Sequence, residues 1–164
     1  MKKKIRYRVG DIVTIPLPNK SYAYGKIFHD STIGIYKLVT KTIEPVEKVM
    51  AREIAFYAGF FDTKILNGDW SIIGSQPFEN DEAAWPPPKY IQDILNPEKY
   101  RIYDKGTMRP ATETEIQGLE KAIMYKPESL ESKIMTELLK DQESRVSPPD
   151  KSGKVYSRGQ SIRP

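Results

Sequence analysis

The chain has 164 residues, which suffices for one domain of ordinary size. It contains no cysteine, which excludes disulfide frameworks, thiolate metal sites and cysteine nucleophiles and fits a reducing compartment. Because no stretch is apolar and long enough for a signal-peptide core or a transmembrane helix, we expect a soluble protein of the cytoplasm that does not bind a membrane.

The first half of the chain predicts consecutive short strands. In residues 11–18, Val13, Ile15 and Leu17 share one face of an extended segment, and Pro16 indicates an edge or a strand end. Asn19 and Lys20 form a short reversal, after which residues 21–28 and 33–39 predict two further strands. Three strands at such short spacing favour a meander that curls into a small barrel.

The middle of the chain alternates apolar runs with turn signals. Residues 44–52 are ambiguous and could hold a helical turn, while residues 54–61, 70–74 and 100–103 are rich in the aromatic and β-branched residues that favour strands. In residues 54–61, alternation places Phe56, Ala58 and Phe60 on one face. Asn67-Gly68-Asp69 predicts a turn, and Pro86-Pro87-Pro88 predicts a loop.

The last third predicts helices and then a tail. Thr112 and Glu115 have the spacing of a capping box, which predicts the start of a helix, and Leu130, Ile134 and Leu138 form the apolar stripe of a second one. We therefore predict a mostly β fold, in which a small antiparallel, barrel-like sheet is followed by two short C-terminal helices. Residues 1–143 are predicted to form a single domain, and the Ser-, Pro- and Lys-rich residues 144–164 a flexible tail.

No catalytic constellation is recognisable. His29 is the only histidine, and its place between a strand and a turn favours a structural role over that of a general base. The glycines build no phosphate-binding loop, and the central carboxylates show no pairing in the sequence. We predict a protein that is not an enzyme, with no catalytic residue, no cofactor and no metal.

The acidic and aromatic residues in the middle of the chain favour a binding surface over a catalytic site. Residues 51–100 contain eight acidic and four basic residues in an otherwise basic chain, and Tyr and Trp are favoured at protein interfaces. Trp85 lies between an acidic loop and three prolines, where it either plugs the end of the barrel or is displayed to a partner. The predicted partner-binding residues are Asp62, Asp69, Glu79, Asp81, Glu82, Trp85, Lys89 and Tyr90. The alternative is a small basic β-barrel that binds nucleic acid, using aromatic stacking and basic side chains such as Lys2, Lys3, Lys4, Arg6 and Arg8.

A spaced series of motifs resembles a known family. The series comprises Gly10-Asp11-Ile12, Ile15-Pro16-Leu17-Pro18, Tyr22-Ala23-Tyr24-Gly25-Lys26, Phe56-Tyr57-Ala58-Gly59, Gly68-Asp69-Trp70-Ser71-Ile72-Ile73-Gly74, Pro87-Pro88-Lys89-Tyr90-Ile91-Gln92-Asp93 and Asn96-Pro97-Glu98-Lys99-Tyr100-Arg101-Ile102-Tyr103. Together these motifs resemble the bacterial immunity protein 26 family, over about residues 10–139.

The resemblance implies a small, mostly β protein that binds a cognate toxin domain in the cytoplasm of the toxin producer and blocks it without catalysis. It implies a polymorphic or contact-dependent toxin system but does not identify the toxin. Inhibitors of nucleases commonly present an acidic surface to a basic cleft. Clustering of the central carboxylates around Trp85 would favour a nuclease partner, and their dispersal would disfavour one.

Overall fold

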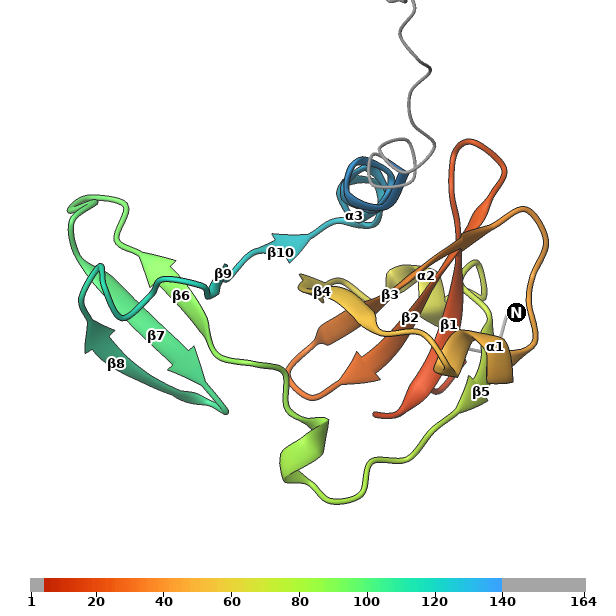
Figure 1. The fold of residues 1–164 in the computed structure, drawn as a ribbon, viewed down its shortest axis with the longest axis horizontal. Coiled ribbons are helices and arrows are strands. Elements are labelled where there is room, and N and C mark those ends of the chain that lie inside the picture. Colours follow the sequence, from red (N-terminus) through yellow and green to blue (C-terminus); the bar gives the residue numbers. More distant parts are fainter. Residues whose placement is uncertain (1–4, 140–164) are drawn as a thin grey trace, which may run out of the picture.

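The computed structural model describes residues 5–139, which form two open β-sheets and several short helices (Figure 1). The first half of the chain builds a meander of four strands: β1 (Asp11–Pro16), β2 (Tyr22–Phe28), β3 (Thr32–Thr40) and β4 (Ile54–Phe60). Lys20 has a positive φ of 67° at the β1–β2 reversal, and the side-chain oxygen of Asn19 accepts a hydrogen bond from the Ser21 N–H at 3.2 Å. The predicted meander is thus confirmed.

The first sheet has the strand order β10-β4-β3-β2-β1-β5. Strand β5 (Ile72–Ser75) pairs antiparallel with β1, and β10 (Met124–Tyr125) pairs parallel with β4. The prediction of a barrel is wrong, because the sheet is open and β5 and β10 are its two edges. These edge strands are four and two residues long, so they offer few backbone groups for closure.

The first sheet is packed on both faces. One face contributes Val13, Ile15 and Leu17 to the larger core, together with Phe56, Phe60 and Trp70. Helix α3 (Pro127–Ile134), which continues as the π-helical turn η2 (Met135–Leu139), and the short helix α2 (Thr63–Leu66) complete this core with Ile65, Leu130, Ile134 and Leu138. Helix α1 (Val46–Met50) packs Val49 with Ile12, Tyr24 and Tyr36 on the other face. The helices thus cover the apolar faces without closure of the sheet.

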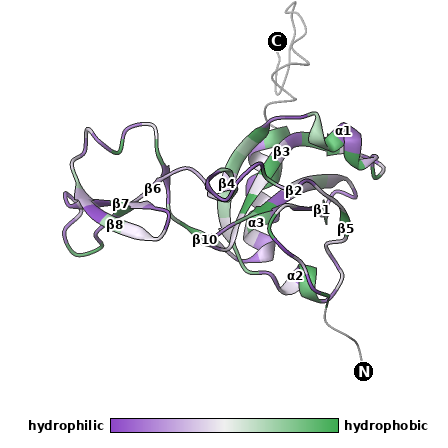
Figure 2. Cartoon of the chain, turned by 90° about the horizontal axis from the view of Figure 1, so that it is seen from below, coloured by the Kyte–Doolittle hydropathy of each residue, from purple (hydrophilic) through white to green (hydrophobic). Residues whose placement is uncertain are grey.

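The second sheet lies to one side of the first in both views (Figures 1 and 2). It comprises β6 (Lys89–Gln92), β7 (Tyr100–Asp104), β8 (Thr107–Ala111) and β9 (Glu120–Lys121), in the order β8-β7-β6-β9. A single-turn 3-10 helix η1 (Glu82–Ala84) precedes it. Within the described residues, Ile102 is the only buried side chain on its strands, and Ile116 joins it from the following loop. We name this four-stranded sheet with its connecting loops, residues 89–121, the arm.

Of the two predicted C-terminal helices, the one with the Leu130 stripe is present as α3, and the one at Thr112 is not formed. The capping box forms, because the Thr112 N–H donates to Glu115 Oε1 at 2.8 Å and the Glu115 N–H donates to Thr112 Oγ1 at 3.2 Å. Only turns follow, however, since Gly118 adopts a φ of +83° and the chain then enters β9. The predicted tail, residues 144–164, lies outside the described residues.

In residues 5–139, no helix has the length and apolarity that a membrane crossing requires. The division of the chain into one domain over residues 1–143 stays a prediction.

Candidate partner-binding surface

The loop between β5 and β6 is held against the β2–β3 turn by His29. The ring Nε2 of His29 lies 2.8 Å from Asp81 Oδ1, and the backbone N–H of His29 donates to the Ala84 carbonyl at 2.9 Å. The indole ring of Trp85 packs on the imidazole with ring centroids 4.8 Å apart. His29 therefore has a structural role, and Trp85 is half-buried on it at the end of the first sheet.

Asp81 and Glu82, the two acidic side chains of this loop that contact basic residues, remain open to solvent. The Asp81 side chain is 82% exposed, and its hydrogen bond with His29 lowers the pKa of the carboxyl. The Glu82 side chain is 74% exposed and lies 2.6 Å from the Lys105 ammonium, which raises the pKa of Lys105. Lys105 belongs to the β7–β8 turn, so this ion pair joins the arm to the loop.

Six of the predicted partner-binding residues lie in the β5–β6 loop or at the start of β6, and the other two lie at helix α2. Asp81, Glu82 and Trp85 lie together around His29, and exposed Glu79 precedes them in the same loop. Lys89 and Tyr90 begin β6. The Lys89 ammonium donates to Thr32 Oγ1 at 3.4 Å, and the Tyr90 ring packs edge-on against Tyr100.

Asp62 and Asp69 form the second group, at helix α2. The Tyr7 hydroxyl donates to Asp62 Oδ2 at 2.6 Å, and burial with this bond raises the pKa of Tyr7 to about 12. Asp69 pairs with Lys64 at 3.6 Å. These two carboxylates hold local structure around α2, and a role for either group in partner binding stays a prediction.

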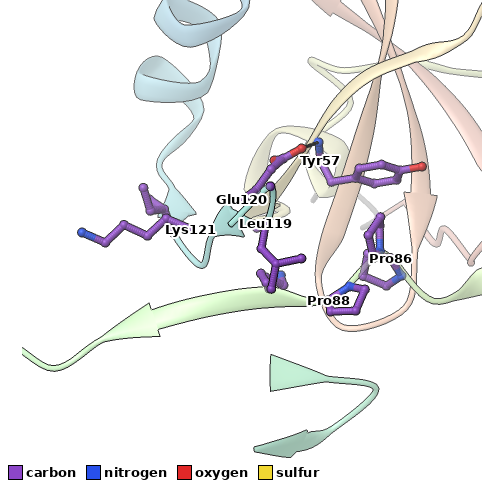
Figure 3. A pocket seen from close by; sticks show the side chains of 11 residues that line it. Tyr57, Pro86, Pro88, Leu119, Glu120 and Lys121 are labelled. Carbon is purple, nitrogen blue, oxygen red and sulfur yellow. Dashed lines mark hydrogen bonds between the residues drawn. The ribbon is translucent and has the colours of Figure 1, made fainter. Parts of the chain in front are cut away.

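A cavity of about 180 Å³ lies where the two sheets meet (Figure 3). Its walls are the proline run, strand β4 at Tyr57 and Gly59, and the segment that includes Leu119 and Glu120. Glu120 is exposed over much of its surface, yet the carboxylate faces the Tyr57 N–H at 3.4 Å and desolvation raises its pKa. The volume equals that of about six water molecules in the liquid, enough for one side chain of a partner.

Six of the sixteen aromatic residues in the described part of the chain are buried and are not available for contact. The side chains of Tyr24, Phe56, Phe60 and Trp70 are at most 7% exposed, and Phe60 stacks on Trp70 with centroids 6.4 Å apart. Phe56, Phe60 and Trp70 belong to the larger core. The buried rings cannot stack on bases, so the nucleic-acid alternative cannot use them.

The loop between β6 and β7 is a further exposed feature that was not among the predicted partner-binding residues. Ile94 and Leu95 are 93% and 87% exposed, more than any other large hydrophobic residue in the described part of the chain. As adjacent aliphatic residues they suggest the interior of a strand. The signal that could have identified them is the turn chemistry around them, Asp93 before the pair and Asn96-Pro97 after it.

No set of three or more histidine, cysteine or acidic side chains is placed to hold a metal ion within residues 5–139. The arrangement instead provides a rigid edge with one aromatic ring, paired charges, a small cavity and an apolar loop. These are features with which a protein surface can be recognised.

Comparison with known proteins gives one match. No curated protein and no solved structure matches the chain. The family described as Immunity protein 26 matches residues 8–101, which is more than half of the chain and extends from the segment before β1 into β7. Immunity proteins are generally not enzymes, and membership in such a family implies binding and neutralisation of a cognate toxin. The chain belongs to the immunity protein 26 family.

Proposed function

We propose that this protein binds one cognate toxin domain and neutralises it by covering the active site or another functional surface of that domain. The observation that carries the proposal is the family match over residues 8–101. Neutralisation by occlusion requires a surface that is already ordered, because ordering a loop on binding reduces affinity.

The β5–β6 loop and the adjoining face of the arm support this proposal. Trp85 offers a large ring next to the exposed side chains of Asp81 and Glu82, and the junction cavity opens beside Pro86 and Pro88. An aromatic anchor with a charged rim is the usual composition of an interface centre. The charged rim would contribute to the association rate and to the choice of partner.

The acidic side chains do not single out a nuclease partner. Asp81 and Glu82 are near Trp85, but Asp81 is hydrogen-bonded to the His29 ring and Glu82 is paired with the Lys105 ammonium. Asp62 and Asp69 lie around α2 with Tyr7 and Lys64. This dispersal weakens the case for a concentrated acidic surface that would fit a basic nuclease cleft.

The proposed mode of action is binding without catalysis, in the cytoplasm of the cell that produces the toxin. A polymorphic or contact-dependent toxin system is the expected setting. The lack of cysteine is compatible with a reducing compartment, and His29 is engaged with Asp81 and Trp85 in a way that stabilises a loop.

Co-expression tests the function. The toxin domain encoded beside this gene is produced in a host cell with the protein or with an empty vector, and growth and co-purification are measured. We expect growth rescue and a stable complex when the protein is co-expressed, and no rescue with the empty vector. A toxic domain that neither binds the protein nor loses its toxicity would refute the proposal for that toxin.

A further inference from the structure

The arm has one end attached to the first sheet and one free end. At the attached end, Lys105 of the β7–β8 turn pairs with Glu82 at 2.6 Å, and a hydrogen bond with Asp30 raises the pKa of Tyr103, in strand β7. The other end is the β6–β7 loop, which projects away from the first sheet (Figure 1). We name residues 93–99 of this loop the tip.

The tip is ordered by its own hydrogen bonds. Asp93 Oδ1 accepts the N–H groups of Leu95 and Asn96, both at 2.8 Å, and these bonds lower the pKa of Asp93. The Lys99 N–H donates to the Asn96 carbonyl at 2.8 Å, and the Gln92 side chain donates to the Pro97 carbonyl at 2.7 Å. The backbone of the tip is thus fixed before any partner arrives.

This fixed loop displays two aliphatic side chains to water. Ile94 is 93% exposed and Leu95 is 87% exposed, whereas the other exposed large hydrophobic residues of the described chain are 40–54% exposed. Single exposed aliphatic residues are common, but an adjacent pair on a preorganised loop forms a knob that gains free energy when it enters an apolar pocket.

The charges around the knob favour a protein partner. Exposed Glu98 and Lys99 stand next to each other, and Asp93 is directly before Ile94, so the rim has both signs. A nucleic acid or an anionic membrane surface would be repelled by the carboxylates, whereas a mixed rim around an apolar centre is typical of protein interfaces.

We infer that the tip is a hydrophobic anchor, in which Ile94 and Leu95 insert into an apolar pocket of the toxin domain. This inference rests on the proposed function and assigns it a second contact, at the opposite end of the arm from the Glu82–Lys105 pair. Contacts at both ends of the arm would let the protein span a cleft of the toxin.

The test compares two variants in a binding titration with the toxin domain encoded beside the gene. The double variant Ile94→Asp, Leu95→Asp changes the knob, and Ile43→Asp changes a 51% exposed isoleucine in the β3–α1 loop of the first sheet. We expect the double variant to weaken binding about 100-fold or more and the control to stay within about threefold of the unchanged protein.

The outcomes separate the inference from the function. A folded double variant that binds as tightly as the unchanged protein would overturn the anchor and leave the function intact, and an unchanged protein that does not bind would overturn both. Circular dichroism checks folding, and Ile94→Ser, Leu95→Ser replaces the double variant if the aspartates unfold the arm.

Two further measurements test whether the knob binds a partner other than the toxin domain. Light scattering of the protein alone reports self-association, and flotation with vesicles of phosphatidylcholine and phosphatidylglycerol reports membrane binding. Knob-dependent dimers or vesicle binding, without a change in toxin affinity, would assign the tip to a second copy or to lipid and overturn the inference.

Discussion

At the scale of single residues, Trp70 is the largest fully buried side chain in the described part of the chain. Its side chain is 1% exposed and stacks on Phe60 within the larger core. Trp70→Ala should lower the free energy of unfolding by about 3–5 kcal/mol, because it removes a large buried ring and leaves a cavity. Phe61→Ala, at a 47% exposed position, should cost less than about 1 kcal/mol. Urea unfolding measures both, and equal costs would contradict the burial that the structure assigns.

The pairing of His29 with Asp81 predicts a pH effect at one residue. The hydrogen bond lowers the pKa of Asp81 below its ordinary value of 3.8 in the folded state. The contribution of this pair to stability is therefore fully present above about pH 3.8 and is lost as the pH falls through the lowered pKa.

Carboxyl titration by NMR checks this assignment. In His29→Ala, the pKa of Asp81 should return toward 3.8, whereas the pKa of Asp93, which depends on the N–H groups of Asn96 and Leu95, should stay low. An Asp81 pKa that does not respond to the substitution would contradict the hydrogen bond between the His29 ring and Asp81.

At the scale of elements, the pairing of edge strand β10 with the first sheet depends on a close approach of β10 to β4. A Cβ on Gly59 would lie 2.8 Å from the Ile123 carbonyl oxygen and 2.5 Å from the Met124 sulfur. Gly59→Ala should therefore separate β10 from β4 and cost about 1–3 kcal/mol. Hydrogen exchange should accelerate at the Phe61 amide, which donates to the Tyr125 carbonyl at 3.4 Å. Ala55→Val, at an exposed position of the same strand, is the control, and unchanged protection in Gly59→Ala would contradict the pairing.

Elements with strong local patterns were predictable from the sequence. The β1–β2 hairpin follows from two strand-like segments on either side of the reversal at Asn19 and Lys20. Helix α3 follows from the stripe of Leu130, Ile134 and Leu138. The capping box at Thr112 formed as predicted but misled as a helix signal, because the turns after it end at Gly118 with a positive φ.

Features that depend on distant partners were not predictable. Strands β9 and β10 are two residues long and exist through parallel pairing with β6 and β4, which no local pattern encodes. The open form of the first sheet also depends on distant pairing, because the short strands β5 and β10 are its edges. At the candidate site, Asp81, Glu82 and Trp85 are neighbours in the sequence, so their proximity was predictable. The location of Asp62 and Asp69 away from Trp85 was not, because these carboxylates contact Tyr7 and Lys64.

At the scale of the whole molecule, the position of the arm is set by few contacts, among them the Glu82–Lys105 pair and the Tyr103–Asp30 bond. Because the chain has no cysteine, spin labels can be attached to cysteines introduced at Lys41 and Glu98, both exposed. We expect one narrow distance distribution between the labels. Tyr103→Phe with Lys105→Gln should broaden it.

Arg109→Gln serves as the matched control for this measurement. It removes the Arg109–Glu115 pair at 3.1 Å, which lies within the arm, and should leave the distribution unchanged. A broad distribution in the unchanged protein would contradict an arm that is held in one position.

The central claim is that the protein neutralises its toxin by covering a functional surface. The most direct measurement is a titration of the purified toxin domain, encoded beside the gene, with the purified protein while toxin activity and complex formation are followed together. The account predicts that activity falls in proportion to complex and is lost at saturation. A saturated complex that keeps full toxin activity would contradict it.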